Sequence, residues 1–213
     1  MSDPKRILCP PRPRGKLDPL RELNKFDKSG NWLAQRKFNG IRTLIWVGPD
    51  GDMRLYDRYL KSHVFDLTSQ RASSILDSLN LEEGKEYWLD GEHLHAKTTS
   101  VKDTFVLYDV LWAGKFLFGK TQVERLDLLS DLCGNPQFLE PGDRALEVGP
   151  GLWMADVFYS NFMDRYKEYL DEDWCEGLVL RKKKSKLDTP CRSVDEEVTW
   201  QKRCRKSSKL YTH

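Results

Sequence analysis

Alternating apolar and polar positions, in short runs rich in β-branched and aromatic residues, predict a chain built largely of β-strands. Asn, Asp, Gly or Pro punctuates several boundaries between these runs. The stretch GPDGDM, residues 48–53, is typical of a hairpin turn between the first two strands. The expected strands cover residues 42–48, 52–58, 86–95, 103–112, 176–183 and 197–205.

Helical periodicity appears in three further segments, residues 69–80, 121–133 and 154–170, where apolar side chains recur every three or four positions. Thr121 and Glu124 have the spacing of a capping box at the start of the second segment. Strand pairs joined by short turns, with a few helices between them, lack the regular strand–helix alternation of a parallel sheet. The pattern therefore predicts an α+β fold in which helices pack on antiparallel sheets.

Length and composition fit a globular chain with one large domain. The 213 residues are 39% hydrophobic and 32% charged, which excludes a disordered chain and allows a sizeable core. We expect an extended arm over residues 1–20, whose first 16 positions hold four prolines, and one domain over residues 21–213. The net charge is only +2, but residues 176–213 hold 11 Lys and Arg against 5 Asp and Glu. Such a basic segment is typical of nucleic-acid contact, although a solvated charged face is the commoner explanation.

The five cysteines are scattered and include no Cys-x-x-Cys pair, which argues for a reducing compartment and against a disulfide framework or a zinc knuckle. His93 and His95 have ligand-like spacing on one strand face, but no Cys or His motif accompanies them, so a structural role is favoured over zinc binding. No apolar run approaches the length of roughly 18 residues that a membrane span needs, and the N-terminus lacks a signal-peptide core. We expect a soluble, intracellular (cytoplasmic) protein that does not bind membranes.

The segment RKFNGIR, residues 36–42, contains charged residues that a simple turn does not require. Apolar runs flank it on both sides, and Asn-Gly is the commonest signal of a two-residue hairpin. A simple hairpin turn explains Asn39 and Gly40. It does not explain Lys37 and Arg42, which flank the pair.

Four other short motifs place polar side chains at the ends of expected strands. Asp90 and Glu92 are two residues apart, so both carboxylates leave the same face of their strand. Tyr108 ends an apolar run, Glu176 begins a strand, and Lys202 lies in a final strand crowded with cations. A lysine able to attack, carboxylates for a metal, an aromatic platform and a second lysine together indicate a phosphoryl-transfer site.

In order and spacing these motifs resemble those of the covalent nucleotidyltransferase superfamily, which comprises ATP-dependent DNA ligases, RNA ligases and mRNA capping enzymes. The resemblance extends over about residues 30–206. Each motif alone is weak, but six in the correct order are specific. The six stretches are KFNGIR, LYDRYL, LDGE, LYDVL, EGLVLR and WQK.

The resemblance implies that Lys37 is a catalytic nucleophile that forms a lysyl-AMP, with ATP and Mg²⁺ as cofactors. Glu92 and Glu176 would be the magnesium ligands, and the charges of Arg36 and Arg42 would help Lys37 to lose its proton. The expected nucleotide-binding residues are Gln35, which would read the adenine edge, Arg42, Glu92, Tyr108, Glu176 and Lys202. The expected nucleic-acid-binding residues are Arg58, Arg203, Arg205 and Lys206.

Three departures from the family pattern affect this interpretation. Asn39 replaces the usual Asp, and Cys204 stands where a second lysine follows Lys202. Ligases usually continue into an OB-fold domain, and none is expected here. Because side chains alternate along a strand, we expect Lys202 and Cys204 on one face and Arg203 and Arg205 on the other.

The leading functional hypothesis is an ATP-dependent polynucleotide ligase that seals 5′-phosphate/3′-hydroxyl nicks in a DNA or RNA duplex, with DNA slightly preferred. An RNA ligase of the same superfamily is the close alternative, and a capping guanylyltransferase is less favoured. Asn39 and Cys204 favour an alternative of another class, a non-catalytic nucleic-acid-binding domain with a ligase-like fold. We expect a monomer, with the role of the OB-fold domain open to a partner.

Overall fold

The computed structural model describes residues 12–13, 17–63, 65, 67–136, 145–187, 197–198 and 201–205. Lys206 therefore lies outside the described residues, as does most of the expected arm over residues 1–20. The helices in this range are α1 (Pro19–Lys28), α2 (Ser69–Asp77), α3 (Gln122–Leu132) and α4 (Phe162–Lys167). The strands are β1 (Arg12–Pro13), β2 (Trp32–Phe38), β3 (Ile41–Val47), β4 (Met53–Tyr56), β5 (Tyr87–Leu94), β6 (Thr104–Ala113), β7 (Leu146–Gly149), β8 (Leu152–Met154), β9 (Cys175–Lys182), β10 (Glu197–Val198) and β11 (Gln201–Arg205).

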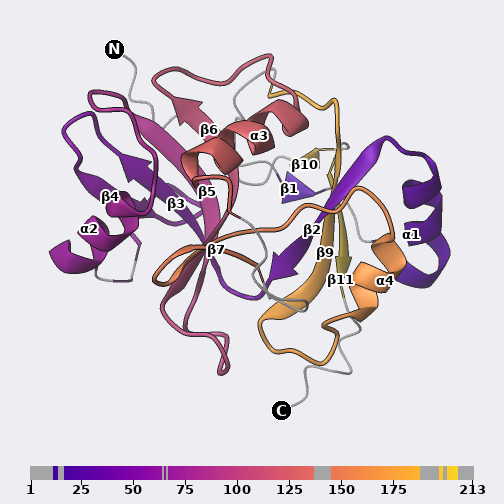
Figure 1. Cartoon of the computed structure of the whole chain (residues 1–213). Coiled ribbons are helices and arrows are strands. Elements are labelled where there is room, and N and C mark those ends of the chain that lie inside the picture. The colour runs from indigo at the N-terminus through magenta and orange to yellow at the C-terminus, as the bar shows by residue number, and fades with distance from the viewer. Residues whose placement is uncertain are drawn as a thin grey trace.

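Two larger sheets form the framework (Figure 1). The six-stranded sheet has the order β4-β3-β5-β6-β8-β7 and is antiparallel except at the β6–β8 pair. The three-stranded sheet has the order β11-β9-β2 and is wholly antiparallel, and β1 and β10 form a short parallel pair. The expected α+β class is confirmed.

Each sheet has its own hydrophobic core. In the large sheet, Ile45 and Leu89 pack in one cluster with Ile75 of α2 and Leu129 of α3. In the small sheet, buried side chains of β2, β9 and β11 pack with those of α1 and α4, which lie side by side at the edge of the molecule (Figure 1). Full burial of a large apolar side chain contributes roughly 1.5–3 kcal/mol, so both clusters contribute to folding.

The helices match the sequence pattern in two of the three expected segments. Helices α2 and α3 lie within them, and the capping box of Thr121 and Glu124 is present. The helix expected over residues 154–170 is wrong, because β8 ends at Met154 and α4 covers only six residues. The preceding chain is extended instead: the backbone of Phe158 exchanges hydrogen bonds with that of Ala34 on β2.

Helix α1 was not expected, although its start carries ordinary helix signals. Asp18 is the N-cap and accepts a hydrogen bond from the backbone of Leu20, and Pro19 occupies the first helical position. These signals were missed because the prolines of the preceding segment led to the expectation of an extended arm up to residue 20. Among the described residues, no helix combines the length and the apolar character that a membrane crossing requires.

The Asn39–Gly40 step does not form a hairpin. Strand β2 pairs with β9 in the small sheet, whereas β3 pairs with β4 and β5 in the large sheet, so the chain crosses between sheets here. A Cβ atom on Gly40 would lie 2.5 Å from the carbonyl oxygen of His93, so only glycine fits this crossing. The hairpin expected at residues 48–53 does form, between β3 and β4.

Candidate active site

The crossing between the sheets places Lys37 in a cleft that both sheets line. Strands β2, β9 and β11 supply one wall, and β3, β5, β6 and the turn after β4 supply the other. Sequence-predicted site residues lining this cleft or its continuation are Gln35, Lys37, Arg42, Arg58, Glu92, Tyr108, Glu176, Arg203 and Arg205. Residues that are up to 170 positions apart in the sequence thus share one cavity.

A β-bulge brings Glu176 to Lys37. Lys37 pairs with Gly177 and Phe38 pairs with Cys175, so Glu176 is the extra residue on β9. Its carboxylate forms an ion pair with the Lys37 amine and lies 3.0 Å from the Arg205 guanidinium. The side chain of Lys37 is 19% exposed, so the amine is held in place and still open to a ligand.

Glu92 approaches Lys37 from the large sheet. Its Oε1 accepts a hydrogen bond from the backbone N–H of Gly40 at 3.2 Å. Burial raises the pKa of Glu92 above its ordinary value, and the charges of Lys37, Arg42 and Lys97 offset only part of this effect. Glu92 and Glu176 line the same part of the cleft as Lys37, and two carboxylates at a cationic site are a donor set that fits Mg²⁺.

Arg42 and Tyr108 lie next to each other in the cleft. The Arg42 guanidinium forms a two-point ion pair with Asp90, with Nε 2.9 Å from Oδ1, and lies 5.7 Å from the centre of the Tyr108 ring. Burial works against the charge of Arg42, but Asp90, Tyr108 and Glu92 outweigh it and raise the pKa above its ordinary value. Arg42 is therefore a fixed cation beside an aromatic surface.

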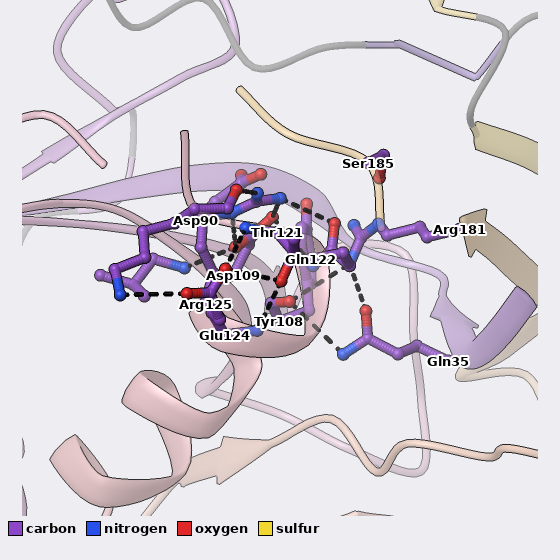
Figure 2. A network of polar contacts seen from close by, with 12 residues as sticks. Gln35, Asp90, Tyr108, Asp109, Thr121, Gln122, Glu124, Arg125, Arg181 and Ser185 are labelled. Carbon is purple, nitrogen blue, oxygen red and sulfur yellow. Dashed lines mark hydrogen bonds and ion pairs between the residues drawn. The ribbon is translucent and has the colours of Figure 1, made fainter. Parts of the chain in front are cut away.

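Arg181 is a cleft residue that the motif comparison missed. Its guanidinium lies 5.3 Å from the centre of the Tyr108 ring and donates to the Tyr108 carbonyl oxygen at 3.2 Å (Figure 2). It also contacts the side-chain oxygen of Gln35, whose amide nitrogen lies 3.4 Å from the Tyr108 carbonyl. The Gln35 amide is thus turned toward protein groups. Alternation along β9, where Val179 also lines the cleft, is the signal that could have found Arg181.

Behind Tyr108, a buried ion pair connects β6 to α3 (Figure 2). Arg125 donates from Nε and Nη2 to the two carboxylate oxygens of Asp109, at 2.9 and 3.0 Å, and Gln122 donates to the same carboxylate at 3.3 Å. Both ionic side chains are almost fully buried. This network fixes the strand that carries Tyr108.

Two of the solved structures with a similar arrangement of elements are DNA ligase structures. A mycobacterial DNA ligase D complexed with ATP and MES aligns with a TM-score of 0.62 and 15% identity, over 95% of this chain and 61% of that chain. The ligase domain of M. tuberculosis LigD aligns with a TM-score of 0.53 and 16% identity, over 82% of this chain and 52% of that one. The chain has the fold of a DNA ligase domain. It spans only about half to three fifths of these structures.

The fold agrees with the resemblance that the motifs indicated. No protein-family model matches the sequence, and a search of curated proteins also finds no match. At 15–16% identity the likeness extends to the fold and not to individual side chains. The positions of the site residues therefore come from the structure itself.

On this ligase fold, strand β11 presents a different set of cations from the one expected. Gln201, Arg203 and Arg205 line the cleft, and the regular pairing with β9 alternates the side chains between them. Lys202 shares the other face with Cys204, which is fully buried in the core with α1 and α4. Contrary to the expected orientation of β11, Lys202 is not among the residues that line the cleft, whereas Arg203 and Arg205 are.

Arg36 also differs from expectation. As the neighbour of Lys37 on β2 it points to the opposite face, where it forms ion pairs with Asp156 and, at 3.0 Å, with Glu168. Its guanidinium lies 4.4 Å from the centre of the Tyr169 ring. Arg36 thus connects the small sheet to the α4 region, and its charge is not directed at the Lys37 amine.

Asn39 has a structural role that an aspartate would not fill. Its side-chain amide donates to the carbonyl oxygens of Asp173 at 2.8 Å and Lys97 at 3.4 Å. Its backbone N–H donates to the carbonyl of Trp174 at 2.8 Å. Asn39 thereby joins the crossing between the sheets to two neighbouring loops, which gives this departure from the family pattern a physical reason.

Replacing Asn39 by Asp should lower the free energy of unfolding by about 1–2 kcal/mol, because an ionised carboxylate has no proton to donate and would face two carbonyl oxygens. Asn39→Ala, which removes the donor without adding a charge, is the matched control and should cost less. Urea denaturation at neutral pH measures both. Equal stability of Asn39→Asp and the wild type would contradict this role for the amide.

Proposed function

We propose that this protein carries out the adenylylation chemistry of an ATP-dependent polynucleotide ligase. The observation that supports the proposal most directly is the Lys37 amine, paired with Glu176 in a cleft that also contains Glu92 and Tyr108, on a ligase fold. A lysine held in this way, and still partly accessible, suits a covalent carrier of a nucleotidyl group.

In the first step Nζ of Lys37 attacks the α-phosphorus of ATP. A P–N bond forms, the bond from the α-phosphorus to the bridging oxygen of the β-phosphate breaks, and pyrophosphate leaves with those electrons. The Lys37 ammonium loses one proton before the attack, and the nitrogen loses a second as the P–N bond forms. Glu176, in contact with Nζ, is the carboxylate positioned to accept these protons and pass them to solvent, and it also orients the amine. The product is a lysyl-AMP phosphoramidate.

The cleft offers suitable partners for both ends of the nucleotide. The Tyr108 ring, backed by Arg42 and Arg181, provides an aromatic surface for the adenine, and Arg203 and Arg205 are the cations for its phosphates. Glu92 and Glu176 would hold Mg²⁺, which when bound neutralises charge on the transferring phosphate. In this arrangement both sheets contribute residues to each end of the nucleotide.

The later steps require a polynucleotide. AMP passes from Lys37 to a 5′-phosphate end, and a 3′-hydroxyl then displaces AMP to form the phosphodiester. Arg58 is exposed on the turn after β4, at the edge of the cleft, where the Asp57 side chain accepts hydrogen bonds from the backbone of Tyr59 and Lys61. This fixed position suits a contact with the phosphate of the end. A nicked DNA duplex is the preferred substrate in this proposal, because the two similar solved structures described above are a DNA ligase D and the ligase domain of a LigD.

Intact mass spectrometry after incubation with ATP and Mg²⁺ tests the proposal. The protein should gain the mass of one AMP, lose it on addition of pyrophosphate, and gain little when GTP replaces ATP. Adding nicked DNA and nicked RNA duplexes to the adenylylated protein then identifies the polynucleotide that accepts the AMP. If no nucleotide adds to the protein, the chain is a binding module with a ligase fold, and the proposal fails.

The two faces of β11 give a second test. Arg203→Ala and Arg205→Ala should each lower the rate of single-turnover adenylylation by about 10- to 100-fold, because each removes a cation from the phosphate end of the cleft. Lys202→Ala lies on the other face and is the matched control, with a rate within about threefold of wild type. If Lys202→Ala abolishes adenylylation and the arginine variants do not, the assignment of the two faces is reversed.

A further inference from the structure

A second group of polar side chains lies outside the cleft, at the open end of the β5–β6 pair. Three of the four histidines in the sequence gather there: the ring centres of His63 and His93 are 5.6 Å apart, as are those of His93 and His95. Asp103 immediately precedes β6, and the pairing of His93 on β5 with Phe105 on β6 places it opposite His95. Nδ1 of His95 lies 2.6 Å from Oδ1 of Asp103.

Three of these residues have the donor geometry of a metal site. One ligand atom from each of His93, His95 and Asp103 lies within 4.8 Å of the other two. Ligands around tetrahedral zinc are about 2.0–2.1 Å from the metal, so they are roughly 3.4 Å from one another. His95 and Asp103 have side chains that are 47% and 56% exposed, so rotation of these two can close the remaining gap.

His93 differs from an ordinary buried histidine. Its ring packs against Phe65 and Phe105, with ring centres 4.4 and 4.5 Å away, and only 1% of the residue is exposed. Its Nε2 atom is buried and has no hydrogen-bond partner among the described residues. A buried polar atom without a partner has lost its hydration with nothing to replace it, so a ligand that binds Nε2 of His93 would stabilise this arrangement.

His63 is the internal comparison. Its Nδ1 accepts a hydrogen bond from the backbone N–H of Phe65 at 3.0 Å, so the proton of the neutral ring is on Nε2, 3.1 Å from Oγ1 of Thr43. Both nitrogens of His63 are therefore engaged within the protein. Among the described histidines, the buried ring nitrogen without a partner is Nε2 of His93.

The ligand types and the surrounding charges indicate which kind of metal ion would bind here. Lys102 donates to the carbonyl of His95 at 2.7 Å and Arg71 donates to the carbonyl of Asp103 at 2.8 Å, so two cations lie nearby and Asp103 is the one carboxylate among the three ligands. Mg²⁺ and Ca²⁺ require several oxygen ligands, whereas two imidazoles and one carboxylate suit zinc. The donor set therefore favours a transition metal over a hard cation.

We propose that His93, His95 and Asp103 form a zinc site that is separate from the ATP cleft. Its position gives it a structural role, because it joins the two ends of the loop between β5 and β6. Within that loop the Lys97 amine donates to the carbonyl of Gly40 at 2.5 Å, and Thr99 Oγ1 donates to Asp173 at 2.6 Å. Zinc at the base of the loop would hold Lys97 against the crossing that carries Lys37.

The test uses Zn²⁺ alone as the probe, on the full chain freed of metal by dialysis against a chelator. Isothermal titration calorimetry should show one site, and thermal unfolding should shift upward with added Zn²⁺. His95→Gln and Asp103→Asn each change an exposed side chain and should weaken binding at least tenfold. His63→Gln is the matched control and should bind as the wild type does.

Zinc bound by a cysteine would also give a calorimetric signal. Co²⁺ is therefore used as a spectroscopic probe, because its absorption distinguishes thiolate ligands from nitrogen and oxygen ligands. Bound Co²⁺ should give visible d–d bands without the near-ultraviolet charge-transfer band of a thiolate. A thiolate band, absence of binding by the wild type, or wild-type affinity in His95→Gln would each overturn the proposal. Lys37→Ala should bind Zn²⁺ normally, so failure of the zinc site and failure of the ligase function are separate outcomes.

Discussion

Lys37→Ala is expected to abolish adenylylation. The proposed reaction needs a nucleophilic nitrogen at the α-phosphorus, and loss of a covalent nucleophile removes the step instead of slowing it. Lys97 is the other lysine that lines this part of the cleft, and its amine donates to the Gly40 carbonyl. Because the Lys97 amine is engaged with that carbonyl, we do not expect Lys97 to replace Lys37. Intact mass after incubation with ATP and Mg²⁺ measures the result.

Lys37→Arg and Lys61→Ala are the controls for this experiment. Arginine keeps the charge that pairs with Glu176 but is not a nucleophile at neutral pH, so Lys37→Arg should fold normally and remain unlabelled. Lys61 is an exposed lysine on the turn after β4, and its removal should leave labelling unchanged. Labelling of Lys37→Ala at the wild-type level would show that another residue carries the AMP.

The fold was predictable to the extent that local patterns decide it. Strands β3, β4, β5 and β6 of the large sheet and helices α2 and α3 follow from periodicity and from the Thr121–Glu124 capping box, whereas β7 and β8 of the same sheet were not expected. The helix expected over residues 154–170 failed because long-range pairing of Phe158 with Ala34 outweighs the apolar spacing. Which sheet each strand joins also could not be predicted, because Asn39–Gly40 has the sequence of a hairpin and connects two sheets.

The site residues that belong to ordered motifs could be predicted from the sequence. Which side chains of a strand face the cleft could not be predicted, because that depends on the orientation of the strand. Lys37, Glu92 and Glu176 meet in the cleft as expected. The choice between Lys202 and Arg203 depends on which face of β11 meets the core, and the buried neighbour Cys204 decides it. In the sequence Cys204 looked like a missing lysine. In the structure it is the apolar residue that turns Arg203 and Arg205 toward the cleft.

The histidines illustrate a limit of motif reasoning. A zinc site at His93 and His95 was set aside because no further Cys or His accompanied them in the sequence. The third ligand in the proposed site is Asp103, which reaches them through the pairing of β5 with β6. A single aspartate has no recognisable spacing pattern in the sequence, so only the tertiary structure identifies Asp103 as a candidate ligand.

Breaking the ion pair between Asp109 and Arg125 is expected to have the largest effect on stability. Both side chains are buried, and removal of one leaves the other charged and uncompensated, which typically costs about 3–5 kcal/mol. Arg125→Met and Asp109→Leu should each lower the free energy of unfolding by about that amount. The double variant should lose less than the sum, because two apolar side chains leave no buried charge. Urea denaturation at pH 7 measures all three.

An exposed ion pair at the N-terminal end of the same helix is the matched control. Lys120 and Glu124 are 3.1 Å apart, with side chains about half exposed, so Lys120→Ala should change stability by less than about 1 kcal/mol. If Arg125→Met is no more destabilising than Lys120→Ala, the buried pair does not hold α3 to β6.

The pH dependence of stability gives a separate test of the same pair. Burial opposes ionisation of Asp109, but Arg125, Arg181 and Gln122 outweigh it and hold the pKa of this carboxyl below its ordinary value. A carboxyl whose pKa is lower in the folded state stabilises the protein fully above the unfolded pKa of about 3.9, and this contribution disappears as the pH falls further. The wild type should therefore lose stability below about pH 4, and Asp109→Leu should lose less over the same range. An equally steep loss in Asp109→Leu would assign the acid sensitivity to other carboxylates. Because Asp109 lies directly behind Tyr108, the same acid transition should also weaken ATP binding in the wild type.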